Sequence, residues 1–463
     1  MKPEDHKKLF GTDGIRGKAG EFPLDGPTVR VIGASLATHL GEQHRGRAPR
    51  IVIGRDTRES GPSIERELTA GAKAAGAEIE SAGVVTTPGV AFLTRDLAAD
   101  AGVVISASHN PYEDNGIKIF DPSGRKLADT TERQIESDIA TDRFSNLRRN
   151  EVDESITNDQ AIDLHNRYID YLQHDVARDL SLNGLSMVVD CANGAAFELA
   201  PQLFANLGAR VIAINNQPDG RNINLNCGSL HIEALQQRVL SERTNLGIAF
   251  DGDADRALFV DAEGKFIDGD ATMWVLANYL HSRAELDNDL VVSTVMTNLG
   301  LEVALRSRGI KLVRTDVGDK YVLEQLLRSK AVLGGEQSGH IIFPTISLAG
   351  DGMITAINLL RVMSDEGRTL AQLAEGFSRY PQILLNVRVR EKIPFENIPT
   401  VRAKAQEIEG SLGERGRLLL RYSGTEPLAR VMIEGEDERE VNRQANALSE
   451  VIRAEIGADQ SHH

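Results

Sequence analysis

Residues 50–85, "RIVIGRDTRESGPSIERELTAGAKAAGAEIESAGVV", place two apolar segments on either side of a segment with helical spacing. The first, residues 50–56, is typical of a buried strand. The second, residues 78–85, is followed by Thr-Thr-Pro, which ends a strand. A strand, a helix and a second strand in this order predict a βαβ unit, so the stretch indicates an α/β domain.

Two later stretches repeat this pattern. One begins with "LSMVVDCANGAA" at residues 185–196 and returns in the strand "RVIAIN" at residues 210–215. The other begins with "DLVVSTVM" at residues 289–296 and continues through residues 298–336 as helix, strand, helix and short strand. The steps from strand to strand are similar, at about two dozen residues. We therefore expect an α/β protein with three topologically similar domains that contain mixed sheets.

The pattern changes near residue 380, where three strand-like segments alternate with helices. The segments are "ILLNVRVRE" at 383–391, "GRLLLRYSG" at 416–424 and "ARVMIEGED" at 429–437. This pattern is typical of a smaller α+β domain. The expected domains are residues 1–165, 166–265, 266–380 and 381–463.

The charge of the chain excludes one class of partner. The 463 residues carry 68 acidic and 52 basic side chains, for a formal net charge of -16. This balance argues against nucleic acid, because a phosphate backbone is bound by clustered basic residues. A few arginines, lysines and loop amides in one place can still bind a small anion.

The cysteines and the apolar segments indicate a cytoplasmic protein with no membrane partner. Cys191 and Cys227 lack metal-type spacing and are too few for a disulfide framework. The N-terminus has no apolar signal region, and no segment approaches the roughly 18 apolar residues that a membrane span requires.

A polar loop follows the predicted strand within "VVISASHNPYEDNGIKIF", residues 103–120, and contains Ser108, His109 and Lys118. Adjacent side chains usually point apart, so His109 is a poor candidate base for Ser108. The G-x-S-x-G signature of many hydrolases is also absent. The loop alone is compatible with an ordinary turn or with a catalytic serine.

A second loop lies within "LGIAFDGDADRALFV", residues 246–260, and contains three alternating carboxylates: Asp251, Asp253 and Asp255. Three carboxylates on one turn repel one another unless a hard cation, best Mg²⁺, is bound. An EF-hand is excluded, because Arg256 and Ala262 stand where that loop needs glycine and glutamate. The alternative is a solvated acidic turn, but the apolar flanks favour a metal site.

The two loops suggest a joint role. Three carboxylates leave room for a fourth anionic ligand, which Ser108 can supply if it is phosphorylated. Ser108 is thus a candidate phosphoryl carrier, with Lys118 as a nearby cation or proton-transfer group.

Three further glycine-containing loops carry groups suited to a sugar phosphate. "FGTDGIRG" (10–17) supplies a cation, "GGEQSGH" (334–340) offers groups for sugar hydroxyls, and "RYSGTEPLAR" (421–430) combines hydroxyls, amides and guanidinium groups for a terminal phosphate. The candidate residues on these loops are Arg16, Glu336, Ser338, His340, Arg421, Ser423, Gly424, Thr425 and Arg430.

In order and approximate spacing, the five loops resemble the α-D-phosphohexomutase family over nearly the whole chain. The resemblance implies three similar α/β domains and a smaller C-terminal domain around a central cleft. It implies a catalytic phosphoserine at Ser108, with Mg²⁺ held by its phosphate and by Asp251, Asp253 and Asp255. The remaining implied roles are catalytic assistance by Arg16, Lys118 and His340, substrate contacts by Arg256, Glu336 and Ser338, and phosphate binding by Arg421, Ser423, Gly424, Thr425 and Arg430.

Gln337 and Gly424 favour the family members that interconvert glucosamine 6-phosphate and glucosamine 1-phosphate. This isomerase reaction passes through a phosphoserine enzyme and a 1,6-bisphosphate, with a hexose 1,6-bisphosphate as activator, and feeds UDP-N-acetylglucosamine and cell-wall precursors. The resemblance is also compatible with a homodimer. The alternatives are a mutase for mannose or glucose phosphates, a metal-dependent sugar phosphatase and a non-catalytic sugar-phosphate sensor.

Two residues depart from the family pattern. Ala254 replaces a glycine in "DGDADR", and we expect it to leave the carboxylates in place. Tyr422 lies in the predicted phosphate loop, where we expect it to alter the selectivity of that loop.

Overall fold

The computed structural model divides into two compact units. The first comprises described residues up to 296 together with 310–375, and the second comprises 297–309 together with the described residues from 376 onward. The ranges that the structure describes are 8–11, 13–43, 47–144, 158–423 and 426–458.

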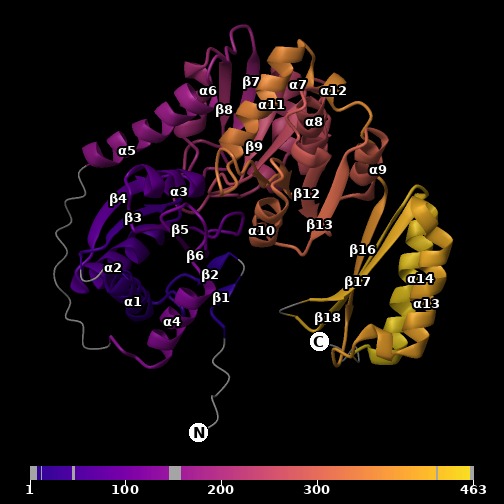
Figure 1. The fold of residues 1–463 in the computed structure, drawn as a ribbon, viewed down its shortest axis with the longest axis horizontal. Helices are drawn as coiled ribbons and strands as arrows, with labels where there is room; N and C mark the ends of the chain where they lie inside the picture. Colours follow the sequence, from indigo (N-terminus) through magenta and orange to yellow (C-terminus); the bar gives the residue numbers. More distant parts are fainter. Residues whose placement is uncertain (1–7, 12, 44–46, 145–157, 424–425, 459–463) are drawn as a thin grey trace. The chain divides into compact units, whose positions relative to one another are not determined.

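The first sheet lies in the N-terminal part of the first unit (Figure 1). Its strands are β1 (Phe10–Gly11), β2 (Gly14–Lys18), β3 (Arg50–Arg55), β4 (Glu78–Val84), β5 (Ala101–Ile105) and β6 (Asp114–Phe120). They are arranged in the order β1-β2-β6-β5-β3-β4. β3 pairs in parallel with β4 and β5, whereas β5 pairs antiparallel with β6, so the sheet is mixed as the sequence predicts.

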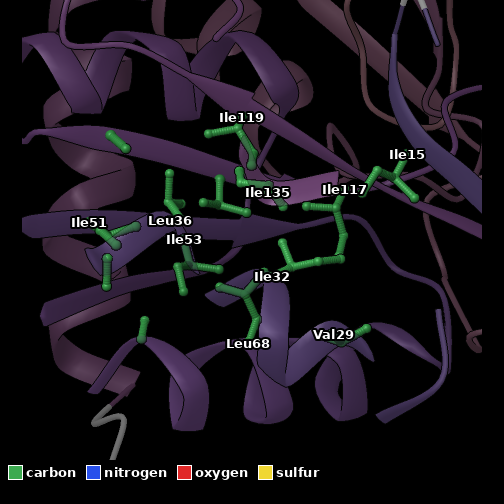
Figure 2. Close-up of a cluster of buried hydrophobic side chains, with 14 of the residues drawn as sticks. Ile15, Val29, Ile32, Leu36, Ile51, Ile53, Leu68, Ile117, Ile119 and Ile135 are labelled. Carbon is green, nitrogen blue, oxygen red and sulfur yellow. The ribbon is translucent and has the colours of Figure 1, made fainter. Parts of the chain in front are cut away.

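The core of this region lies between the sheet and its helices, as Figure 2 shows. Side chains of alternate strand residues point to one face, so Ile51 and Ile53 of β3 meet Leu36 and Leu68 of the covering helices. Each fully buried side chain of this size contributes about 1.5–3 kcal/mol. The helices that contribute to this core are α1 (Gly26–Gln43), α2 (Gly61–Ala74) and α4 (Asp129–Ala140), while α3 (Thr87–Asp96) follows β4 and has no residue in it.

The second sheet has the order β11-β10-β9-β7-β8. Its strands are β7 (Ser186–Asp190), β8 (Arg210–Ile214), β9 (Leu246–Phe250), β10 (Ala257–Asp261) and β11 (Phe266–Ile267). The helices of this region are α5 (Asn158–Tyr171), which continues into η1 (Leu172–Val176), α6 (Leu199–Asn206), η2 (Gly228–Leu230) and α7 (Glu233–Glu242).

The third sheet has the order β13-β12-β14-β15. Its strands are β12 (Leu290–Thr294), β13 (Lys311–Thr315), β14 (Gly334–Gly335) and β15 (Ile341–Ile342). The helices between residues 269 and 373 are α8 (Gly269–Ser282), η3 (Asp287–Asp289), α9 (Leu299–Ser307), α10 (Asp319–Ser329), α11 (Gly352–Glu366) and α12 (Leu370–Leu373).

The three sheets share one arrangement of four strands. The orders β4-β3-β5-β6, β8-β7-β9-β10 and β13-β12-β14-β15 are equivalent, with the first three strands parallel and the fourth antiparallel to the third. The prediction of three topologically similar α/β domains with mixed sheets is confirmed. The turn before each antiparallel strand therefore has the same place in all three sheets.

The C-terminal part of the chain forms an antiparallel sheet with the order β16-β18-β17, which confirms the predicted α+β pattern. Its elements are β16 (Gln382–Arg388), η4 (Phe395–Asn397), α13 (Pro399–Leu412), η5 (Gly413–Arg415), β17 (Gly416–Tyr422), β18 (Leu428–Gly435) and α14 (Glu438–Ile456). Helix α9 groups with this second unit. None of the helices in the described ranges combines the length and the apolar composition that crossing a membrane requires.

Candidate active site

Three chemically distinctive loops occupy the equivalent place in the three similar sheets. Residues 106–113 follow β5, residues 251–256 follow β9 and residues 336–340 follow β14, and each loop leads to the antiparallel strand. Within the first unit, contacts connect all three loops: Ser108 bonds to Asp251, and the imidazole of His340 approaches Asp255. The repeated topology therefore brings together residues that are distant in the sequence.

Ser108 is buried at the tip of its loop. Its hydroxyl donates a hydrogen bond to Asp251 Oδ2 at 2.6 Å. Its φ of 52° lies in the left-handed region, which non-glycine residues seldom adopt. The structure thus holds this serine in an unusual conformation that aims its oxygen at the acidic loop.

His109 turns toward Ser108, so the expectation that the two side chains point apart is wrong. Its Nδ1 lies 3.3 Å from Ser108 Oγ and 3.2 Å from a guanidinium nitrogen of Arg256. Burial and the Arg256 charge lower the pKa of His109 to about 4. The ring is therefore neutral at pH 7, with Nδ1 accepting a hydrogen bond from Arg256.

The acidic loop fits a hard divalent cation. Asp251, Asp253 and Asp255 are buried, and each offers a carboxylate oxygen within 4.8 Å of the others. Two buried oxygens, Asp253 Oδ1 and Asp255 Oδ1, have no hydrogen-bond partner among the described residues. Burial, followed by the charges of Asp255 and Asp253, raises the pKa of Asp251 well above its usual range. A bound cation would coordinate these oxygens and offset the repulsion among the three carboxylates.

A glycine lets the acidic loop approach the serine loop. A Cβ at Gly252 would lie 2.5 Å from the carbonyl oxygen of Ser108, which is closer than van der Waals contact allows. The backbones of the two loops therefore meet only because residue 252 has no side chain.

Lys118 lies on β6, the strand that follows the serine loop. Its ammonium is 2.8 Å from Asp253 Oδ2, 3.5 Å from Asp255 Oδ2 and 3.1 Å from Asp13 Oδ2. Burial lowers the pKa of Lys118, but Asp13, Asp253 and Asp255 outweigh it and raise the pKa well above its usual range. Lys118 is therefore a fixed cation beside the candidate metal ligands.

Arg16 reaches the same cluster from β2. It forms an ion pair with Asp13, and its Nη1 lies 3.5 Å from Asn110 Oδ1 in the serine loop. Its Nε is buried and has no hydrogen-bond partner in the part of the chain that the structure describes. One donor of Arg16 is thus available to a ligand.

His340 and Arg256 border the acidic loop. His340 Nε2 is 4.0 Å from Asp255 Oδ2, and Arg256 Nε is 3.7 Å from Asp255 Oδ1. The His340 ring lies on the backbone of Gly350, where a Cβ would come within 2.4 Å of the ring. A cavity of about 170 Å³ opens beside His340, Lys118 and Asp255.

The sugar-binding candidates lie on the same loop as His340. Glu336 Oε1 accepts a hydrogen bond from the Gly318 amide at 3.2 Å, and its charge contributes to the raised pKa of Arg256. Ser338 Oγ and Gln337 Nε2 are buried atoms without a hydrogen-bond partner in the described ranges. The loop therefore presents polar groups that a ligand can satisfy.

The remaining candidates lie in the second unit. Arg421 on β17 is directly opposite Arg430 on β18, and Arg430 Nη2 is 3.4 Å from Ser423 Oγ. Two like charges at opposed positions destabilise a sheet unless an anion lies between them. Gly424 and Thr425 lie outside the described residues.

The side chain of Tyr422 packs against the core of the second unit, so any effect on the selectivity of the phosphate loop, which stays a prediction, would be indirect. Its ring stacks on Phe395 with centroids 4.2 Å apart and packs against the hydrophobic core, while its hydroxyl donates to the Ile393 carbonyl. Strand alternation directs Tyr422 away from the face that carries Arg421 and Ser423. Ala254 is buried with a φ of 56°, and the three carboxylates still meet around it.

The sequence did not single out four charged or polar residues of this network, namely Asp13, Thr87, Lys126 and Asp319. Thr87 Oγ1 donates to Asp253 Oδ2 at 2.5 Å, and Lys126 Nζ bridges Asp13 Oδ1 at 2.8 Å and Asp319 Oδ2 at 2.6 Å. Asp13 lies inside the glycine-containing stretch that drew attention to Arg16, so a signal was present for it. The local sequence around Thr87 indicates only the end of a strand.

Four family models match successive parts of the chain. They describe the phosphoglucomutase/phosphomannomutase alpha/beta/alpha domains I, II and III, at residues 7–146, 166–264 and 268–380, and the C-terminal domain of the same family at residues 384–451. The chain belongs to the phosphoglucomutase/phosphomannomutase family, which confirms the resemblance seen in the sequence.

Curated relatives match over nearly the whole chain. A phosphoglucosamine mutase of Solibacter usitatus is 48% identical over 97% of this chain and 99% of its own length. A phosphoglucosamine mutase of Syntrophotalea carbinolica is 45% identical over 97% of this chain and 98% of its own length.

Solved structures share the fold. A phosphoglucomutase/phosphomannomutase family protein from Burkholderia thailandensis aligns with a TM-score of 0.78 at 23% identity, covering 96% of this chain and 97% of the other. An N-acetylphosphoglucosamine mutase of Aspergillus fumigatus, solved with GlcNAc-6P and magnesium, aligns with a TM-score of 0.64 at 18% identity, covering 96% and 95%.

Proposed function

We propose that this protein is an isomerase that interconverts glucosamine 6-phosphate and glucosamine 1-phosphate, a step toward UDP-N-acetylglucosamine and cell-wall precursors. The observation that carries the proposal is the 2.6 Å hydrogen bond that aims Ser108 Oγ into the buried carboxylate cluster. The curated phosphoglucosamine mutases, 43–48% identical to this chain, support the choice of substrate.

The reaction has two transfers and releases no phosphate. In the first, O1 of glucosamine 6-phosphate attacks the phosphorus of phospho-Ser108, the P–Oγ bond breaks, a base takes the O1 proton, and Ser108 Oγ takes up a proton to become a hydroxyl. The 1,6-bisphosphate then reverses its orientation in the site. In the second, Ser108 Oγ gives up its proton and attacks the phosphorus on O6, the P–O6 bond breaks, and O6 gains a proton. A hexose 1,6-bisphosphate supplies the first phosphoryl group to Ser108.

The carboxylates of Asp251, Asp253 and Asp255, together with the phosphate of Ser108, would hold one Mg²⁺. When bound, the ion supplies positive charge that offsets the charge on the phosphoryl group. The buried oxygens of Asp253 and Asp255 that accept no hydrogen bond within the described chain support this assignment.

Basic side chains would act on the phosphoryl group and the reacting oxygens. Lys118 stays protonated because its pKa is raised, so its role is that of a fixed cation and hydrogen-bond donor. Arg16 offers its buried Nε, and His340 borders the cavity where the sugar oxygen would lie. His340 is the better candidate for proton transfer, since its ring can both donate and accept.

Each unit carries candidate groups for substrate binding. Arg256, Glu336 and Ser338 would contact the sugar in the first unit. Arg421, Ser423 and Arg430, with Gly424 and Thr425, would bind the phosphate that is not being transferred. The opposed pair Arg421 and Arg430 supports this role, because it concentrates two forked donors on one face.

We also propose a cytoplasmic location. Cys191 and Cys227 are buried free thiols in the described part of the chain, as expected in a reducing compartment.

A coupled assay tests the proposed function. The purified protein, with Mg²⁺ and a catalytic amount of glucose 1,6-bisphosphate, is given glucosamine 6-phosphate, mannose 6-phosphate or glucose 6-phosphate while free phosphate is monitored. We expect the highest kcat/KM for the amino sugar, without phosphate release. A preference for a neutral hexose would assign a different substrate, and phosphate release equal to substrate loss would make the protein a phosphatase.

A further inference from the structure

Arg58 is a fully buried arginine whose donors converge on one loop. Its side chain is 0% exposed, and its Nη2 donates to the carbonyl oxygens of Ser108 at 3.0 Å and Asn110 at 2.9 Å. Its Nη1 donates to the carbonyls of Asp114, at 3.0 Å, and Pro111. All four acceptors belong to residues 108–114, the stretch that carries the proposed phosphoserine.

Asp56 completes the arrangement on the other side of the guanidinium. Arg58 Nε donates to Asp56 Oδ2 at 2.9 Å, and the hydroxyl of Ser106 donates to the same oxygen at 2.6 Å. Ser106 Oγ in turn accepts a hydrogen bond from the Ser108 amide at 2.9 Å. The carbonyl of Ser108 therefore bonds directly to the buried Arg58–Asp56 ion pair, and its amide is connected to the same pair through Ser106.

The hydrogen bonds of its amide and its carbonyl explain the backbone conformation of Ser108. A φ of 52° is rare for a serine and persists only where the surroundings fix the backbone on both sides. Because the amide and the carbonyl are fixed, Ser108 Oγ is held within hydrogen-bond distance of Asp251.

A second donor reaches the same carbonyls from the second α/β domain. Asn224 Nδ2 lies 2.9 Å from Ser108 O and 3.1 Å from Asn110 O. The Ser108 carbonyl also lies against Gly252 of the acidic loop. Two domains thus hold one carbonyl, next to the candidate metal ligands.

We infer that Arg58 is a positioning residue for phosphoryl transfer: it holds the Ser108 carbonyl so that Oγ faces the carboxylate cluster, and Asn224 assists it. The inference rests on the proposed function. Lysine cannot replace Arg58, since one ammonium cannot span four carbonyls and Asp56 as the planar fork does. Preorganisation of this kind acts on the transfer step more than on substrate binding.

Arg361 offers a matched control. Its Nη2 also donates to two backbone carbonyls, of Val176 and Arg178, both at 3.0 Å, at the end of η1. These carbonyls belong to a helix end and to none of the loops that hold the candidate site residues. Arg361→Lys therefore removes the same kind of interaction without altering the serine loop.

The experiment compares Arg58→Lys, Asn224→Ala and Arg361→Lys in the full-length enzyme. Quenched-flow measurement of phosphoryl transfer from glucose 1,6-bisphosphate to Ser108 gives the rate, and steady-state kinetics and thermal unfolding give KM and Tm. For Arg58→Lys we expect a transfer rate lower by about 10²- to 10³-fold with KM within about threefold. For Asn224→Ala we expect about a tenfold loss. Arg361→Lys should transfer at the wild-type rate even where its Tm falls.

Two results would overturn the inference. One is a folded Arg58→Lys enzyme with a wild-type transfer rate, and the other is an equal loss in Arg361→Lys. If Arg58→Lys does not fold, Asn224→Ala decides: a wild-type rate in that variant contradicts the inference, and a selective loss of kcat supports it. A wild-type protein that forms no phosphoserine would overturn the proposed function itself, and the inference with it.

Discussion

The serine loop of the first unit and the phosphate loop of the second unit both present groups for a phosphoryl ligand, but they are built differently. Ser108 is buried, and its amide, carbonyl and hydroxyl all have hydrogen-bond partners at 3.0 Å or less. In the second unit, Arg430 is 30% exposed, and its nearest partners, Ser423 and Glu426, lie at 3.4 Å and 3.6 Å. Its buried Nε has no partner among the described residues.

This difference matches the two tasks of a mutase. The proposed phosphoryl carrier must stand in one place for both transfers, which fits a serine whose amide, carbonyl and hydroxyl all have hydrogen-bond partners. The phosphate-binding loop must accept a phosphate attached to either end of the sugar, so donors left unsatisfied by the protein are an advantage. The comparison predicts that substitutions in the serine loop reduce turnover, whereas substitutions in the phosphate loop weaken binding.

The largest effect is expected for Ser108→Ala. The variant has no oxygen to carry the phosphoryl group, so kcat should fall by at least about 10⁴-fold while substrate affinity changes little. Steady-state kinetics and calorimetric titration with glucosamine 6-phosphate measure the two quantities. Ser123→Ala, an exposed serine in the next turn, is the control. Mutase turnover close to the wild-type rate in Ser108→Ala would exclude the carrier role.

Gly252→Ala tests whether the close approach of the two loops matters. The added Cβ would lie 2.5 Å from Ser108 O, so the serine loop must move away from the carboxylates. We expect kcat to fall by about 10²- to 10³-fold, because small displacements of a reacting group are costly. Gly41→Ala is the matched control, since nothing lies within 4 Å of its added Cβ. Equal kinetics for both variants would contradict the rigid arrangement.

The rigid region should also respond to pH through Asp351. This buried residue caps the N-terminus of α11, next to Gly350, on which the His340 ring lies, and it accepts a hydrogen bond from Tyr168 at 2.6 Å. Burial raises its pKa from 3.8 to about 6, so the folded state binds the proton more tightly than the unfolded state. This contribution to stability is complete below pH 4 and is lost as the pH rises through 6, a change of about 3 kcal/mol.

Asp351→Asn isolates this effect, because the amide keeps the helix cap and does not titrate. Chemical unfolding of both proteins between pH 4 and pH 7 should show the stability of the wild type falling relative to the variant. Parallel curves across this range would show that the carboxyl has an ordinary pKa.

The smallest effect is expected in the phosphate loop. Arg430→Gln removes a charged donor from a partly exposed site, so we expect KM for glucosamine 6-phosphate to rise by about 10- to 100-fold with a smaller change in kcat. Arg443→Gln, an exposed arginine paired with Glu440, is the control. A loss confined to kcat would contradict the proposal that the phosphate loop acts in binding and the serine loop in turnover.

The sequence predicted those candidate residues whose signal lies within a single short segment of the chain. Ser108, the three aspartates and Lys118 stand in short segments that follow predicted strands, and the repeated βαβ spacing indicated three similar domains. It did not predict Arg58 or Asn224, because their role depends on backbone carbonyls brought near by folding, and neither residue type is unusual in a polar loop. The packing of Tyr422 was not predicted for a related reason, since only the strand register shows which face it occupies.

A labelled phosphoryl group, followed through one turnover, shows directly whether Ser108 carries it to the amino sugar. The protein is loaded with radiolabelled glucose 1,6-bisphosphate, mapped by peptide mass spectrometry, and chased with unlabelled glucosamine 6-phosphate in a single turnover. We expect label on Ser108 that passes to the amino sugar at a rate at least equal to kcat. Label on another residue, or label released as inorganic phosphate, would contradict the carrier role of Ser108.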